Sequence, residues 1–170
     1  MKTINIPKRF GYPTLDITIN GKEYTVKSGE DISVEDHIAE AIENAMALAP
    51  KIGVSRNKFA QLVARTITEV TLDDLAGVTE IPRYLFEGCS NLTRVDIPSS
   101  VKSIGYHSFV NCTSLERVTL HSTTPPTIQA GIFNGCPSTC RYAVPKESVE
   151  LYKTAEFWNT IASRIVAIDE

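Results

Sequence analysis

Four cysteines are the residues of this chain best suited to chemistry, because a thiolate can bind zinc, form a disulfide or act as a nucleophile. Cys89, Cys112 and Cys136 follow one another at intervals of 23 and 24 residues, which is the interval of a structural repeat. Stacked repeats bring such thiols together, but zinc needs three or four ligands that converge tetrahedrally. We therefore expect a buried ladder of small side chains, with no metal site and no cofactor. Cys140 falls outside the interval, and a Cys136–Cys140 disulfide is an alternative that a cytosolic origin disfavours.

Other catalytic signatures are absent from the sequence. It contains no GxGxxG, P-loop, HExxH or GxSxG motif, and His37, His107 and His121 are scattered without an adjacent nucleophile. We therefore expect a protein that is not an enzyme. The net charge of −3 gives no electrostatic reason to expect nucleic-acid binding, and the lack of a run of 18 apolar residues predicts no membrane span. The first residues lack an apolar segment of the secretory type, so we expect the chain to begin in a cytoplasm.

Charged side chains offer a different kind of chemistry, namely contact with an anionic partner. Arg94, Arg117 and Arg141 recur at the same intervals as the cysteines and form what we call the arginine row. If each lies on a strand of one parallel sheet, the three side chains stand about 4.8 Å apart on its solvent face, with Glu69 in line. The row predicts a surface that contacts an anion or a glycan. The alternative is a solvated face whose like-charge repulsion is relieved by nearby acidic side chains.

The segment that positions these residues repeats itself from residue 81 to residue 144. The apolar pattern L-x-x-V-x-I at 92–97 returns as L-x-x-V-x-L at 115–120 and, in weaker form, at 139–144. A period of about 20–29 residues with this pattern predicts a leucine-rich-repeat solenoid, here with about three repeats. The predicted repeat core comprises Ile81, Phe86, Cys89, Leu92, Val95, Ile97, Ile104, Phe109, Cys112, Leu115, Val118, Leu120, Ile128, Phe133 and Cys136. One position per repeat should adopt the left-handed backbone that Gly and Asn tolerate best, namely Gly88, Asn111 and Gly135.

Atypical units should close this stack, because its two ends expose apolar cross-sections. Residues 67–72 match the strand pattern and predict a degenerate first rung, covered by the helix before it. At the other end, residues 146–154 look helical and Trp158 supplies bulk for a cap. Residues 165–168 predict a final short strand.

The N-terminal part predicts a β-hairpin followed by helices. Residues 14–19 and 22–26 alternate polar and apolar side chains on either side of Asn20-Gly21, a preferred pair for a type I′ turn. Ser33 opens a variant capping box, so we expect a helix from there to about residue 49 and a second helix over 55–65. The predicted fold class is α+β. Its parts are an N-terminal anchoring or oligomerisation module (1–53), a capping helix (54–66), the solenoid (67–145) and a C-terminal cap (146–170).

The repeat at residues 81–98, Ile-x4-Phe-x2-Cys-x2-Leu-x2-Val-x-Ile-Pro, resembles the BspA-type leucine-rich repeats. The ending that contains Tyr142-Ala143-Val144-Pro145 and Trp158 is similar to the unit that often closes these arrays. Such repeats occur in secreted bacterial surface proteins and in virion proteins of tailed phages. The resemblance therefore implies binding and display rather than catalysis.

Residues 4–13 and 32–42 resemble the start of small head-fibre or capsid-decoration proteins of tailed phages. This resemblance implies a virion structural protein, assembled in the host cytoplasm, whose N-terminal module binds capsid or other virion proteins. The implied anchoring residues are Ile4, Ile6, Phe10 and Tyr12. A homo-oligomer, a trimer by analogy with fibres, would display the repeats outward to a host-surface protein or glycan. The alternative is a BspA-like adhesin or protein-interaction module on the bacterial cell surface.

Overall fold

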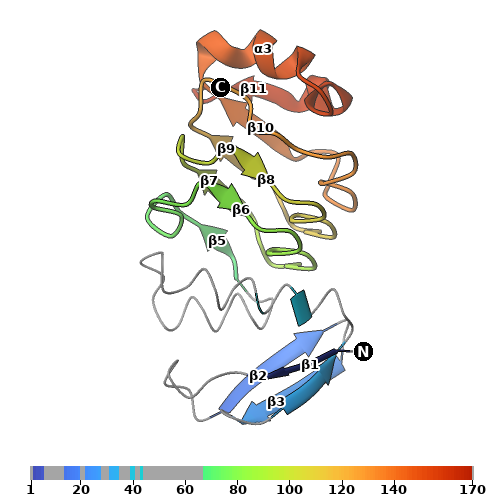
Figure 1. Ribbon diagram of the computed structural model, residues 1–170. Helices are drawn as coiled ribbons and strands as arrows, with labels where there is room; N and C mark the ends of the chain where they lie inside the picture. Colours follow the sequence, from blue (N-terminus) through green and yellow to red (C-terminus); the bar gives the residue numbers. More distant parts are fainter. Residues whose placement is uncertain are drawn as a thin grey trace.

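The computed structural model describes residues 2–5, 14–19, 22–27, 31–34, 39–40, 43 and 67–169. From residue 67 onward the chain winds into a solenoid with a parallel sheet along one side (Figure 1). The order in this sheet is β11-β10-β9-β7-β5. The strands are β5 (Glu69–Val70), β7 (Arg94–Ile97), β9 (Arg117–Leu120), β10 (Arg141–Val144) and β11 (Ile165–Ala167). The three predicted repeats thus correspond to β7, β9 and β10, the partial rung to β5, and the final strand adds β11 to the same sheet.

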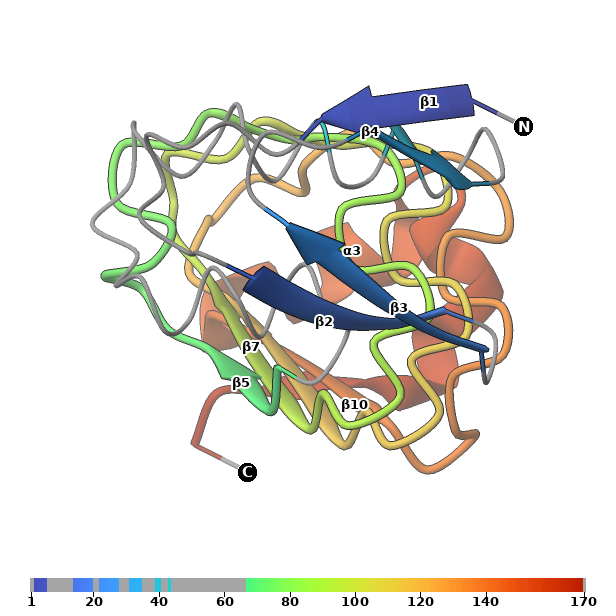
Figure 2. The same ribbon diagram turned by 90° about the horizontal axis from the view of Figure 1, so that it is seen from below.

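The return side of each repeat forms a second, smaller sheet. β6 (Glu80–Ile81) pairs in parallel with β8 (Ser103–Ile104), and Ser103 forms an isolated bridge with Thr127 of the next repeat. Figure 2 looks along the stack and shows β5, β7 and β10 on one side, with the return segments on the other. Because alternate residues of a strand point to opposite faces, one set of side chains fills the space between these two sides.

The core between the two sides contains the predicted repeat positions. All of them are buried except Cys136, which is half-buried. Phe86, Phe109 and Phe133 stack along the solenoid axis, with ring centroids 5.1 Å and 5.6 Å apart and interplanar angles of 19° and 23°. Aromatic pairs of this kind add about 0.5–1.5 kcal/mol each beyond the area that they bury. The phenylalanine ladder therefore holds successive repeats in register.

The repeated cysteines are part of this core and also bond one repeat to the next. The Cys112 thiol donates to the carbonyl of Phe86 at 3.2 Å, and the Cys136 thiol donates to the carbonyl of Phe109 at 3.1 Å. Each of these carbonyls belongs to the preceding repeat. A thiol is a weak donor, and each carbonyl also accepts from a backbone N–H, that of Cys89 at 3.0 Å and that of Cys112 at 3.4 Å. The side chain in this position thus fills space and gives a backbone acceptor a second, weaker donor.

Two positions in each repeat turn adopt a left-handed backbone. The predicted position has φ of 68° at Gly88, 59° at Asn111 and 78° at Gly135. A second position, which the sequence does not predict, has φ of 61° at Tyr84, 57° at His107 and 75° at Gly131. This conformation costs roughly 1–2 kcal/mol in residues with a Cβ atom. Edge-to-face contact between the rings of Tyr84 and His107, with centroids 5.7 Å apart, offsets part of that cost.

The C-terminal cap consists of η2 (Lys146–Ser148), α3 (Val149–Thr154), η3 (Trp158–Arg164) and β11. It covers the β10 end of the solenoid (Figure 1). Two buried side chains fasten it to the loop at 121–126. The Tyr152 hydroxyl donates to the carbonyl of Ser122, and the Trp158 indole donates to the carbonyl of Pro126, both at 2.9 Å. The loop that lengthens the third repeat is therefore a docking point for the cap.

The described N-terminal strands form two antiparallel pairs. β2 (Thr14–Ile19) pairs with β3 (Lys22–Lys27) in the register Ile19↔Lys22, while the predicted turn residues Asn20 and Gly21 lie outside the described residues. β1 (Lys2–Asn5) pairs with β4 (Asp31–Val34), so the prediction that a helix opens at Ser33 is wrong. Pairing with a distant strand overrides the local capping signal there. Residues 39, 40 and 43 are helical, whereas the predicted helix over 55–65 lies outside the described residues.

Candidate interaction surface

The pairing of the parallel strands aligns the arginine row. Arg94 is the register partner of Arg117, which is in turn the partner of Arg141. Glu69 on β5 is the partner of Arg94 and therefore ends the row. Neighbouring strands lie about 4.8 Å apart, so the backbones at Arg94 and Arg141 are separated by roughly 10 Å. Arg94 and Arg141 are exposed and Arg117 is half-buried, which places the row on the outer face of the sheet.

The arginines of the row have different hydrogen-bond partners. The Arg117 guanidinium donates to the carbonyl of Ile168 at 2.7 Å. Because β10 lies between β9 and β11, this side chain crosses the outer face of β10, where Ala143 is buried. The Arg141 guanidinium donates to the carbonyl of Thr139 at 3.2 Å and stays exposed. Arg117 therefore helps to hold the C-terminal segment, while Arg141 remains accessible to a partner.

Acidic side chains surround the row and make the face mixed in charge. Glu69 and Glu116 are exposed beside Arg94 and Arg117. Asp96 stands on the same face of β7 as Arg94, and one of its carboxylate oxygens lies 3.8 Å from Nε2 of His121. That distance is too long for a hydrogen bond. Acidic groups thus lie at the end of the row and beside it, so the face suits a partner with a matching charge pattern better than a uniform polyanion.

A fourth arginine continues this register directly before the last strand. Arg164 follows Arg141 by 23 residues and directly precedes Ile165, the register partner of Tyr142. Its Nη1 donates to the carbonyl of Pro137 at 3.2 Å, and its guanidinium carbon lies 5.3 Å from the centre of the buried Tyr142 ring. The side chain therefore turns away from the row. The repeat interval in the sequence could have identified this position.

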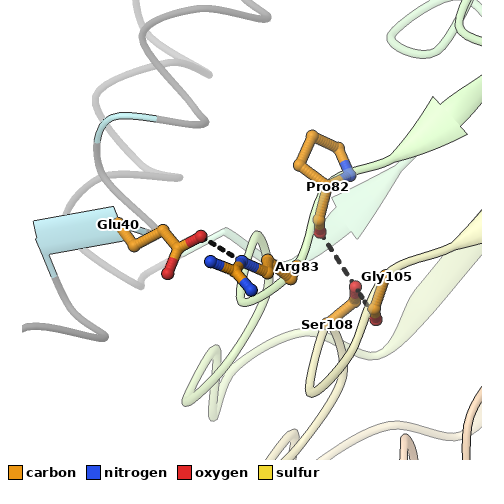
Figure 3. Close-up of polar contacts among 5 residues, drawn as sticks. All are labelled: Glu40, Pro82, Arg83, Gly105 and Ser108. Carbon is orange, nitrogen blue, oxygen red and sulfur yellow. Dashed lines mark hydrogen bonds and ion pairs between the residues drawn. The ribbon is translucent and has the colours of Figure 1, made fainter.

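A link that the sequence does not reveal joins the first repeat turn to the helical residues before it (Figure 3). The Arg83 guanidinium donates to the carboxylate of Glu40, which lies 43 residues earlier. Behind Arg83, the Ser108 hydroxyl is close to the carbonyls of Pro82 and Gly105, at 2.9 Å and 2.5 Å. A Cβ atom on Gly105 would lie 2.8 Å from the Arg83 Cα, so only glycine lets the two repeat turns approach this closely. The close packing fixes the backbone from which Arg83 reaches Glu40.

The groups with catalytic or metal-binding potential are dispersed or enclosed. His107 stacks on Tyr106 with ring centroids 3.6 Å apart, and His37 lies outside the described residues. Over the described ranges, no three His, Cys, Asp or Glu side chains converge as metal ligands. None of the four cysteines forms a disulfide. Hydrogen bonding with Cys112 lowers the pKa of the half-buried Cys136 thiol, whereas burial raises the pKa of Cys140 to about 11.

The predicted anchoring segment falls mostly outside the described residues. Ile4 lies on β1, while Ile6, Phe10 and Tyr12 are not described. Where the structure describes the chain, it contains no helix with the length and apolar character needed to cross a bilayer.

The family of the chain follows from the repeat region. A family model described as "BspA type Leucine rich repeat region (6 copies)" matches residues 54–169, which is more than half of the sequence. No curated protein matches the chain significantly. The resemblance of the N-terminal segment to phage proteins has no counterpart in these comparisons. The match agrees with the period, the phenylalanine and cysteine ladders and the parallel sheet, and it indicates a protein-interaction or adhesin module. The chain belongs to the BspA-type leucine-rich-repeat family.

Proposed function

We propose that this chain is a non-catalytic binding module whose solenoid presents the outer face of its sheet to a protein or a glycan. The observation that carries the proposal is the arginine row, aligned by strand register on that face. A short parallel sheet gives these cations a fixed spacing, because each stands on a strand held by the core behind it. Rigid presentation lowers the entropic cost of binding.

The nucleophilic groups of the solenoid support binding rather than catalysis. Three of the four thiols are buried, and those of Cys112 and Cys136 donate to backbone carbonyls. A nucleophile needs a base within hydrogen-bond reach and access for a substrate. The imidazole of His121 lies beside Asp96 and that of His107 against Tyr106, so neither is paired with a thiol or hydroxyl nucleophile in the described part of the chain.

The accessible cations define the chemistry of the partner. Arg94 and Arg141 are exposed on strands whose backbones lie about 10 Å apart, while the Arg117 guanidinium between them donates to Ile168. A partner with two acidic groups at a similar spacing would contact both exposed guanidinium groups and avoid Glu69 and Glu116. An acidic protein segment and an acidic glycan both meet this description.

A charge-removal experiment tests this proposal. The double variant R94Q/R141Q removes the two exposed cations of the row, and the matched control K102Q/K146Q removes two exposed cations elsewhere on the solenoid and cap. Labelled protein would be measured for binding to whole bacterial cells and to an array of acidic glycans. We expect R94Q/R141Q to lose at least tenfold in binding and the control to bind like the wild type. Equal binding by both variants would contradict the proposal.

The setting of the module is a further part of this proposal. We infer a phage virion protein, in which the N-terminal module attaches to capsid proteins as a homo-oligomer, with a bacterial surface adhesin as the alternative. The sequence similarity of residues 4–13 and 32–42 supports the virion setting. Light scattering on the purified chain separates the two: a fibre component should have a mass near three times that of one chain. A strict monomer would count against the virion setting.

A further inference from the structure

A small hollow separates the third repeat turn from the C-terminal cap. Its volume is about 70 Å³. One water needs about 10–15 Å³ of such space, so the hollow accommodates about five waters or one small polar group. Its apolar wall includes Phe157 of the cap, and its polar lining consists of Gln129, Asn134, Thr160 and Arg164.

Arg164 gives this hollow a fixed positive charge. Its guanidinium is held by the Pro137 carbonyl and by the face of the Tyr142 ring, so its orientation is set before any ligand arrives. The residue is half-buried, and no carboxylate in the described part of the chain forms an ion pair with it. A partly buried cation without a counter-charge is unfavourable. The guanidinium fork matches a carboxylate, which it can bind through two parallel hydrogen bonds.

The surroundings of Arg164 indicate what carries the carboxylate. Gln129, Asn134 and Thr160 are exposed and place amide and hydroxyl groups around the opening. Phe157 is half-buried and supplies an apolar wall, although its φ of 62° is one that residues with a Cβ atom rarely adopt. Strained residues of this kind cluster at functional sites. An apolar wall beside several hydrogen-bonding groups suits a sugar, which has both a C–H face and hydroxyl groups.

We propose that this hollow binds the carboxylate of an acidic sugar. The carboxylate enters and bonds to Arg164, and the ring stays at the opening, because about 70 Å³ is too small to enclose it. The ring then lies against Phe157, with its hydroxyl groups toward Gln129 and Asn134. The inference rests on the proposed binding function, but it uses no residue of the arginine row.

Titrations with soluble sugars test the site. N-Acetylneuraminic acid and glucuronic acid would be titrated into the ¹⁵N-labelled full chain, with N-acetylmannosamine and glucose as neutral counterparts. We expect saturable shifts of the amide signals of residues 128–134 and 157–164 with the acidic sugars, and affinities at least tenfold weaker for the neutral sugars. Equal binding of neutral and acidic sugars would overturn the proposal. Tighter binding of an acetylated dipeptide than of either acidic sugar would overturn the sugar assignment in favour of a peptide carboxylate.

Variants locate the binding in the hollow. R164Q should weaken binding of the acidic sugars more than tenfold, and R164K several-fold, because lysine keeps the charge but loses the planar fork. K146Q, which changes an exposed lysine outside both the hollow and the arginine row, should bind them like the wild type. Wild-type binding by R164Q would overturn the proposal.

A second variant decides the matter should R164Q fail to fold. Gln129 is exposed and makes no hydrogen bond with the described residues, so Q129A should fold normally and weaken binding about two- to fivefold. Unchanged binding by Q129A, without signal shifts around the hollow, would overturn the proposal. The outcome is separable from the proposed function, since R94Q/R141Q leaves the hollow intact and R164Q leaves the exposed arginines in place.

Discussion

Replacing Tyr152 by phenylalanine removes a single hydroxyl group from the contact between the cap and the solenoid. That hydroxyl is buried and donates to the carbonyl of Ser122 at 2.9 Å. Tyr142 provides a matched control, because its ring is equally buried while its hydroxyl has no hydrogen-bond partner of good geometry in the described residues. The two Tyr→Phe substitutions thus delete the same atom, once with a bond and once without.

The expected effects on stability differ in size. Loss of the Tyr152 hydroxyl leaves the Ser122 carbonyl without this donor in the interior, which should cost about 1–3 kcal/mol of the free energy of unfolding. For a chain of this length, a loss of about 1.5 kcal/mol lowers Tm by roughly 3–6 °C. Loss of the Tyr142 hydroxyl removes a buried polar group that forms no hydrogen bond of good geometry and lies beside the Cys140 thiol, a weak hydrogen-bonding group. Tyr142→Phe should therefore be within about 0.5 kcal/mol of the wild type, or more stable.

Urea unfolding followed by tryptophan fluorescence measures the stability of both variants. Trp158 is the only tryptophan, and its ring centroid lies 5.3 Å from that of Tyr152. The midpoint should fall for Tyr152→Phe and stay or rise for Tyr142→Phe. Equal losses in the two variants would refute the reasoning, because the ring environment, and not the hydrogen bond to Ser122, would then decide the stability.

Three further predictions concern packing and ionisation. Gly105→Ala should cost about 1–3 kcal/mol, because the new Cβ would meet the backbone of Arg83, and a thermal melt identical to that of the wild type would contradict this. At pH 8, iodoacetamide should modify Cys136 at least ten times faster than Cys140, since the pKa of Cys136 is lowered and that of the buried Cys140 is raised to about 11. Peptide mass spectrometry measures the two rates. Faster modification of Cys140 would contradict these two pKa shifts. Burial raises the pKa of both Tyr142 and Tyr152, so the unfolded chain loses these protons at a lower pH than the folded chain. The contribution of these two groups to the free energy of unfolding should be constant below about pH 10 and fall above it. A free energy of unfolding that does not fall from pH 10 to 12 would contradict this.

The repeat interval predicts much of the solenoid, because stacked repeats place equivalent residues side by side. The strand register of the arginine row and the left-handed φ of Gly88, Asn111 and Gly135 agree with positions counted from the sequence. The left-handed φ of Tyr84 and His107 could not be predicted, since residues of these types rarely adopt it.

Contacts between segments that are distant in the sequence could not be predicted either. The bond from Arg117 to Ile168 spans 51 residues and changes an apparently free cation into one that holds the C-terminal segment. The hollow at Arg164 needs both the third repeat turn and η3, and neither segment alone indicates it. The prediction at Ser33 failed for the same reason, because pairing of β1 with the distant strand β4 replaces the expected start of a helix.

The most direct test of the central claim is the salt dependence of binding to the cell or glycan target found for the wild type. Contacts between exposed charges weaken as the Debye length shrinks from about 10 Å at 0.1 M salt to about 3 Å at 1 M. Wild-type binding should therefore fall steeply over this range, and binding by the charge-reversed R94E/R141E should be lost even at low salt. Strong binding by R94E/R141E with the salt dependence of the wild type would contradict the proposal that the outer face of the sheet is the binding surface.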